Sequence, residues 1–277
     1  MRFYKLKLLC FIAIGYCFQS NALPDIPSLM DCEDIIFFSG FQNDSEPSNG
    51  SGGSYPGAFA RTIFSHGSNR TYYVSIPPDY QPNKAFPLLF SWHGAAGAGT
   101  AQANAQATRD FWKPFADQNH LIIVAQAGTG STGGGFTFPN DIAILYDILD
   151  DMHAHYNIEL KRVYGHGFSS GGHLMHTLML FYNQGYPAYS VSAGTFADAV
   201  FEDPNVPANS DVLPVFVSVG QSDPLKPTIE QERIKFLNAG WVEGETYWLD
   251  VFNGGHQLDT NLPQKMWDKL CTFSRQP

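Results

Sequence analysis

The stretch Arg162-Val163-Tyr164-Gly165-His166-Gly167-Phe168-Ser169-Ser170-Gly171-Gly172 passes abruptly from apolar residues to glycine and serine. Its apolar start is typical of a short buried strand, and the run from His173 to Phe181 that follows is typical of a helix. Gly167 to Gly171 matches the G-x-S-x-G pattern, which places a serine on a sharp turn between strand and helix. Ser169 is therefore the candidate nucleophile, beside the free N–H groups of the following helix.

The same glycines also open a dinucleotide-binding fingerprint, G-x-G-x-x-G. Its third glycine position is Ser170, and no acidic residue lies about twenty residues further on, near Ser190, to contact a ribose. The sequence therefore predicts no nucleotide cofactor at this turn. An ordinary glycine-rich loop remains the alternative interpretation of the pentapeptide.

The first 22 residues have the pattern of a secretory signal peptide. Arg2, Lys5 and Lys7 precede an apolar run at 8–18, and Ser20-Asn21-Ala22 is a small-residue cleavage site. The run is short for a membrane span, so we expect cleavage and export to an extracellular or periplasmic location.

Removal of this peptide leaves a strongly acidic chain. The whole sequence has 16 basic and 26 acidic residues, and cleavage after Ala22 removes three basic ones, giving a formal charge of −13. Such a surface repels nucleic acids and anionic membranes, so neither is expected as a partner.

Two of the four cysteines, Cys32 and Cys271, remain after cleavage, one near each end of the mature chain. In an oxidising compartment this pair predicts a disulfide that ties the termini together. Two free buried cysteines are the alternative.

The chain divides into the signal peptide, an N-terminal arm at 23–57 and a catalytic domain at 58–277. The arm contains a polar, glycine-rich segment, 43–54, which is expected to be a flexible surface loop. The domain alternates short apolar runs with amphipathic ones, a pattern typical of a mainly parallel sheet with helices on both faces. The expected strands are 58–64, 71–76, 88–92, 121–125, 163–164, 189–192, 213–219 and 247–252, and the expected helices are 103–119, 141–156, 173–181, 228–238 and 265–273.

A serine nucleophile needs a base, and the base needs a carboxylate to orient it. Asp223 and His256 each follow a predicted strand, at the sheet edge where open α/β folds place their sites. The chain order Ser169, Asp223, His256 is that of an α/β-hydrolase. The alternative for both residues is simple turn chemistry, and Asp250, inside a strand, is the rival acid.

The turn after Trp92, beginning His93-Gly94, can aim a backbone N–H at a carbonyl oxygen. Ala95 and Ser170 are the expected N–H donors of an oxyanion hole. A flexible loop is the alternative for this turn. The histidine pairs His153/His155 and His173/His176 lack a zinc motif such as H-E-x-x-H, so no metal is expected.

Four sets of segments, together with this residue order, resemble the secreted esterase family that includes polyhydroxybutyrate depolymerases and feruloyl esterases. They are 72–77, 90–94, 140–142 with 162–164 and 167–172, and 219–223 with Gly254-Gly255-His256. The resemblance covers roughly residues 57–275 and implies an α/β-hydrolase fold, a Ser169–Asp223–His256 triad and ester substrates. Gln257-Leu258-Asp259 departs from the family, whose members often carry a tryptophan soon after the histidine.

The leading hypothesis is a secreted serine esterase that removes feruloyl or acetyl groups from plant polysaccharides. A polyester depolymerase, a peptidase with the same triad, and a non-catalytic secreted binding protein remain alternatives. Trp92, His93 and Phe136 are candidate substrate contacts, although Trp92 and Phe136 are equally compatible with the core. Phe168 is expected to belong to the core.

Overall fold

The computed structural model describes residues 46–131, 133–181, 185–196 and 212–275, all of which belong to the unit at 31–277. The predicted signal peptide and Cys32 lie outside these residues. The strands are β1 (Gly57–Ser65), β2 (Ser68–Ile76), β3 (Phe86–Trp92), β4 (Ile122–Gln126), β5 (Ile158–Phe168), β6 (Tyr189–Ser192), β7 (Val215–Gly220) and β8 (Tyr247–Phe252). The helices are α2 (Ala101–Gln118), α3 (Asn140–His155), α4 (Ser170–Phe181), α6 (Lys226–Asn238) and α7 (Leu262–Leu270).

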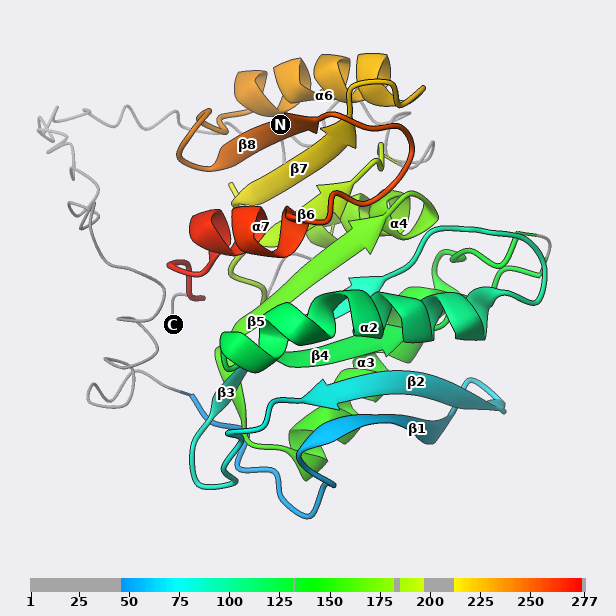
Figure 1. Cartoon of the computed structure of the whole chain (residues 1–277), viewed down its shortest axis with the longest axis vertical. Helices are drawn as coiled ribbons and strands as arrows, with labels where there is room; N and C mark the ends of the chain where they lie inside the picture. The colour runs from blue at the N-terminus through cyan, green and yellow to red at the C-terminus, as the bar shows by residue number, and fades with distance from the viewer. Residues whose placement is uncertain (1–45, 132, 182–184, 197–211, 276–277) are drawn as a thin grey trace, which may run out of the picture. The chain divides into compact units, whose positions relative to one another are not determined.

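In the described part of the chain the eight strands form one sheet, in the order β1-β2-β4-β3-β5-β6-β7-β8 (Figure 1). The β1–β2 and β2–β4 pairs are antiparallel, and every other neighbouring pair is parallel. The carboxyl ends of β3, β5, β7 and β8 therefore meet at one edge, which brings the residues after these strands together.

Helices cover both faces of this sheet (Figure 1). Side chains alternate between the faces along each strand, so Leu88 and Phe90 of β3 belong to one apolar cluster and Leu89 to the other. Buried residues of α3, α4 and α6 complete the first cluster, and those of α2 and α7 complete the second. Two cores thus hold the sheet from opposite sides, as the alternating pattern predicts.

The strand that leads to Ser169 is longer than predicted. The apolar signal begins at Val163, whereas β5 begins at Ile158 and includes the buried polar residues Glu159 and Arg162. Arg162 Nη1 lies 3.4 Å from Glu159 Oε2. Because the two charges are paired with each other, both side chains can be buried in β5, although the sequence alone does not predict a buried strand there.

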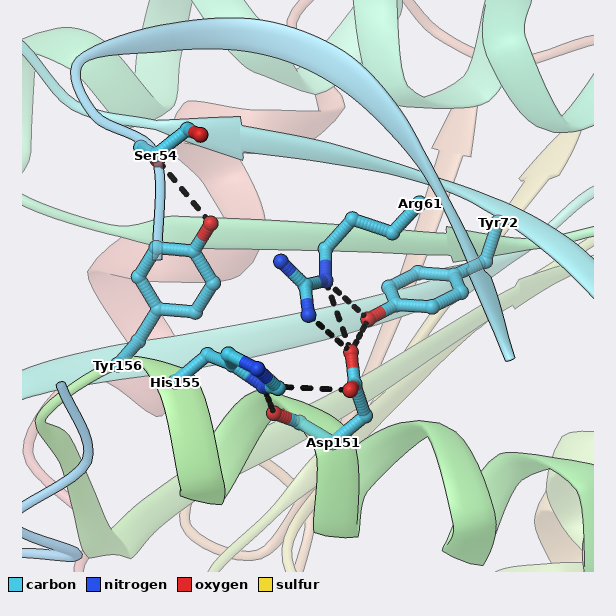
Figure 2. A network of polar contacts seen from close by, with 6 residues as sticks. All are labelled: Ser54, Arg61, Tyr72, Asp151, His155 and Tyr156. Atoms are coloured by element: carbon cyan, nitrogen blue, oxygen red, sulfur yellow. Dashed lines mark hydrogen bonds and ion pairs between the residues drawn. The ribbon is translucent and has the colours of Figure 1, made fainter. Parts of the chain in front are cut away.

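A polar cluster anchors the β1–β2 hairpin to α3 (Figure 2). Arg61 Nε donates to the Tyr72 hydroxyl at 2.9 Å and to Asp151 Oδ2 at 2.8 Å, and Tyr72 also donates to Asp151. Burial alone would raise the pKa of the Asp151 carboxyl, but the hydrogen bonds from Arg61 and Tyr72 outweigh it and lower that pKa. The cluster is a structural clamp, since its groups bind one another.

The N-terminal arm is held in place over its described residues, 46–56, which differs from the predicted flexible loop. Ser48 N donates to Ile158 O at 2.9 Å, and Gly53 N donates to His155 O at 3.1 Å. A Cβ atom on Gly50 would lie 2.2 Å from the carbonyl oxygen of His153. The glycines thus permit close contact with the end of α3, a role that composition does not distinguish from flexibility.

Candidate active site

Ser169 lies on the turn between β5 and α4 with a φ of +50°. This left-handed conformation costs a non-glycine residue about 1–3 kcal/mol. It is held by the hydrogen bond from Ser169 N to Ser192 O and by that from His173 N to Ser169 O, both of 2.9 Å. The strained backbone conformation of this turn therefore lies at Ser169 itself.

The flanking glycines serve a different purpose, the close approach of backbone segments. A Cβ on Gly167 would lie 2.3 Å from Gly171 O, and one on Gly171 would lie 2.7 Å from His93 O. Neither distance is compatible with a side chain. The G-x-S-x-G spacing therefore packs β5, the first turn of α4 and the turn after β3 against one another.

The structure brings Ser169, His256 and Asp223 together. His256 Nε2 lies 2.8 Å from Ser169 Oγ, and His256 Nδ1 lies 2.9 Å from Asp223 Oδ2. The Asp223 side chain is fully buried, whereas 37% of the His256 side chain is exposed. The other carboxylate oxygen of Asp223 accepts the N–H of Leu225 at 2.8 Å. Asp223 therefore both stabilises its turn and contacts His256.

Backbone contacts fix the loops that carry Asp223 and His256. Gln221 N donates to Phe252 O and Ser222 N donates to Gly254 O, both at 2.8 Å. A Cβ on Gly220 would lie 2.2 Å from the carbonyl oxygen of Gly255. The separation between the carboxylate and the imidazole is therefore set by rigid contacts at the ends of β7 and β8.

The rival acid Asp250 lies elsewhere. Both of its carboxylate oxygens accept hydrogen bonds of 3.0 Å from Lys265 Nζ of α7. Asp250 thus ties β8 to α7 and makes no contact with His256.

The two expected oxyanion donors have unused N–H groups. Within the described residues, neither Ala95 N nor Ser170 N donates a hydrogen bond, whereas Gly171 N donates to His93 O at 3.1 Å. The Ser170 hydroxyl faces away from this role, because its oxygen accepts the Phe136 N–H at 3.1 Å. Two N–H groups beside Ser169 are thus available for a negatively charged oxygen.

His93 connects the turn after β3 to the glycine-rich loop at 128–135. Its Nε2 accepts the Gly128 N–H at 3.0 Å, so Nδ1 carries the proton and donates to Gly94 O at 2.8 Å. Burial lowers the pKa of His93, which favours this neutral form. Both ring nitrogens of His93 are thus bound to backbone groups, and a contact between His93 and substrate stays a prediction.

The far end of the same loop is held by Asp141, which is fully buried. Its Oδ2 accepts the N–H of Thr137 at 2.6 Å and that of Thr129 at 3.2 Å. The side chain of Gln126 donates to Asp141 Oδ1 at 3.2 Å. Asp141 therefore positions the loop that contacts Ser170 and takes no part in the site itself.

The burial of the aromatic residues near Ser169 differs from the prediction. Trp92 is fully buried and its Nε1 donates to Gln126 at 3.0 Å, so it belongs to the core and is not a substrate contact. Phe136 is half-buried, with its ring centre 5.3 Å from that of Trp92. Phe168, which was expected in the core, is also only half-buried, and its ring centre lies 5.2 Å from that of His256. It precedes Ser169 at the end of β5, where the continuous burial of residues 162–167 stops.

The histidines of the pair His173/His176 make other contacts in the structure. His173 Nδ1 lies 2.7 Å from the Thr195 carbonyl oxygen, and burial lowers the pKa of His176 to about 3. The described parts of the chain contain no group of three or more potential metal ligands. They also contain no helix long and apolar enough to span a membrane.

No protein-family model matches the chain. A stretch of 107 residues, 38% of the chain, is 35% identical to a bifunctional acetylxylan esterase/xylanase of Neocallimastix patriciarum, and it spans only 15% of that protein. A feruloyl esterase module from Clostridium thermocellum shares the fold with a TM-score of 0.61 and 16% identity, over 84% of this chain and 92% of that one. A ferulic acid esterase from the anaerobic fungus Anaeromyces mucronatus gives a TM-score of 0.59 and 17% identity, over 80% and 92%.

These similarities confirm the predicted α/β-hydrolase fold. The matched segment of the acetylxylan esterase/xylanase supports the resemblance to esterases that the sequence indicates, and the feruloyl esterases share the fold. The resemblance to polyester depolymerases stays a prediction.

Proposed function

We propose that this protein is a serine esterase that cleaves carboxylic esters through an acyl-enzyme on Ser169. One observation carries the proposal: His256 bridges the Ser169 hydroxyl and the buried Asp223 carboxylate, with separations of 2.8 and 2.9 Å. This is the arrangement that general-base activation of a serine requires, and it recurs on unrelated hydrolase folds.

In the first half of the reaction, Ser169 Oγ bonds to the ester carbonyl carbon while its proton passes to His256 Nε2. The bond between the carbonyl carbon and the alcohol oxygen then breaks, and the alcohol leaves with that proton. Asp223 holds the imidazole tautomer and stabilises the imidazolium. Its burial suits this role, because a desolvated carboxylate interacts more strongly with the charge on His256.

In the second half, water replaces the alcohol and repeats the sequence, releasing the acid and restoring Ser169. The N–H groups of Ala95 and Ser170 stabilise the negatively charged oxygen in both halves. Loss of a single donor of this kind costs about 10²–10³ in kcat, so the hole is expected to contribute strongly.

We propose feruloyl or acetyl groups on plant polysaccharide as the substrate class. The proposal rests on the matched segment of the acetylxylan esterase/xylanase and on the fold shared with the feruloyl esterases. The test compares purified protein on methyl ferulate, acetylated xylan and 3-hydroxybutyrate oligomers. Activity on the first or second supports the assignment, activity on the oligomers alone favours the polyester alternative, and no ester hydrolysis by folded protein favours a binding protein.

We also propose that the chain is exported and that Cys271 pairs with Cys32. Cys271 is 1% exposed and disulfide-bonded, and Cys32 lies outside the described residues. Peptide mapping of secreted protein without reduction should recover both cysteines in one linked fragment. Alkylation of both as free thiols would contradict the pairing.

A further inference from the structure

A cavity of about 210 Å³ opens beside the Ser169 site, against α2. The turn at 93–96, which carries the Ala95 N–H, lines part of it, and one face of α2 lines another part. The remaining lining residues are Asn104, Ala107, Thr108 and Phe111 of α2, with Phe168 and Leu258. The α2 residues recur at helical spacing, so they present one continuous surface to the cavity.

The position of this cavity relative to His256 decides which half of an ester it can receive. Phe168 packs against the His256 ring, and Leu258 follows His256 by two residues. The alcohol oxygen must lie within hydrogen-bond reach of His256 Nε2, because it takes the proton from there. The substituent on that oxygen therefore lies beside His256, whereas the acyl chain extends away from it.

The lining indicates the chemistry of the group that fits. Phe111, Phe168 and Leu258 are half-buried and provide an apolar surface. The Thr108 hydroxyl lies on the same surface, is on a residue only 8% exposed, and has no hydrogen-bond partner among the described residues. A ring with one apolar face and hydroxyl groups at its edge, such as a sugar ring, satisfies both features.

We propose that this cavity is a leaving-group pocket that binds the alcohol half of the ester as a single, sugar-sized ring. The inference rests on the proposed esterase function. It adds that the ring of the alcohol binds in the cavity beside α2. Ala107 sets the width of the pocket because it is exposed at the middle of the α2 wall, where a larger side chain fills the cavity without entering the core.

The test uses two isomeric esters that place the same ring on opposite sides. Cyclohexyl acetate carries the ring in the alcohol, methyl cyclohexanecarboxylate carries it in the acyl group, and methyl acetate is the small reference. In Ala107→Phe, kcat/KM for cyclohexyl acetate relative to methyl acetate should fall at least about tenfold. The ratio for methyl cyclohexanecarboxylate should stay within about twofold of wild type. Ala103→Phe, on an exposed residue of α2 outside the lining, is the matched control.

A second measurement separates the pocket from a general disturbance of the site. The alcohol has left before deacylation, so the deacylation rate measured after an acetyl burst should match wild type in Ala107→Phe. The proposal would be overturned if Ala107→Phe lowered kcat/KM selectively for methyl cyclohexanecarboxylate or equally for both ring esters. It would also be overturned if neither ratio changed or if deacylation became slower. Wild-type protein that cleaves methyl acetate but not cyclohexyl acetate would also overturn it. Wild-type protein that cleaves no ester would instead refute the proposed function.

Discussion

Two serine–histidine pairs in this protein have nearly the same separation and opposite character. Ser169 Oγ lies 2.8 Å from His256 Nε2 at the edge of the sheet, and Ser91 Oγ lies 2.9 Å from His166 Nδ1 inside it. His166 also reaches Ser192 Oγ at 3.2 Å, so the buried group has the residues of a relay except the carboxylate. Distance alone does not distinguish a nucleophile from a structural hydroxyl.

The surroundings of the two pairs account for the difference. The indole N–H of Trp112 donates to Ser91 Oγ at 3.0 Å, and the two ring nitrogens of His166 lie within hydrogen-bond distance of Ser91 Oγ and Ser192 Oγ. Each ring nitrogen of His166 thus has a partner, and burial lowers the pKa of His166 to about 3. By contrast, His256 is partly exposed, contacts a carboxylate, and lies near two unused N–H groups. A nucleophile therefore needs access, an oriented base and oxyanion donors together.

The largest expected effect is the loss of the Ser169 hydroxyl. Ser169→Ala should lower kcat/KM for any cleaved ester by at least about a thousandfold, because no other group can form the acyl-enzyme. Ser170→Ala should retain substantial activity, since its backbone N–H is the part that the mechanism uses. The opposite result would place the nucleophile at Ser170.

Removing the charge of Asp223 is expected to have the next largest effect. Asp223→Asn should reduce kcat by up to about four orders of magnitude, because the amide favours the wrong imidazole tautomer, and KM should change little. Asp250→Asn is the matched control, since Asp250 is bound to Lys265. Steady-state kinetics of both variants test this assignment. A large loss of kcat in Asp250→Asn with none in Asp223→Asn would refute Asp223 as the carboxylate that orients His256.

The sequence allowed much of this arrangement to be predicted, because the order of Ser169, Asp223 and His256 past strand ends follows from alternating apolar runs and turn residues. It did not reveal that Trp92 is fully buried, that both ring nitrogens of His93 are bound to backbone groups, or that Phe168 is only half-buried. Those outcomes depend on which loops pack over a strand end, and strand periodicity stops there. The sequence also did not predict that β5 begins before Val163. Glu159 and Arg162 are charged, and the sequence alone does not show that they pair with each other and can therefore be buried.

For the buried pair we expect an effect on stability and not on catalysis. Ser91→Ala leaves the Trp112 N–H and a His166 nitrogen without partners, which should lower the free energy of unfolding by about 1–3 kcal/mol. Ser75→Ala is the matched control, because Ser75 Oγ is buried without a partner in the described chain, so its removal should cost little or stabilise. Denaturant titration checks both. Equal costs would contradict the importance of the Ser91 hydrogen bonds.

The smallest expected effect is a change in how stability depends on pH. The pKa of His166 is about 3 in the folded protein, against an ordinary value of 6.5. Between these values the unfolded chain binds a proton that the folded one does not, so stability is lost as pH falls below about 6.5. His166→Gln should reduce this slope by up to about 1.4 kcal/mol per pH unit. Parallel curves for the variant and wild type would show that His166 does not titrate on unfolding.

Active-site labelling tests the central claim most directly, because one reagent shows whether Ser169 or Ser91 is the activated serine. Folded wild-type protein is treated with a fluorophosphonate, whose phosphorus bonds to an activated serine oxygen as fluoride leaves, and the modified peptide is sequenced by mass spectrometry. We expect one adduct, on Ser169, with labelling strongly reduced in Asp223→Asn and undiminished in Ser91→Ala. An adduct on another serine, or no adduct in folded protein, would contradict the account.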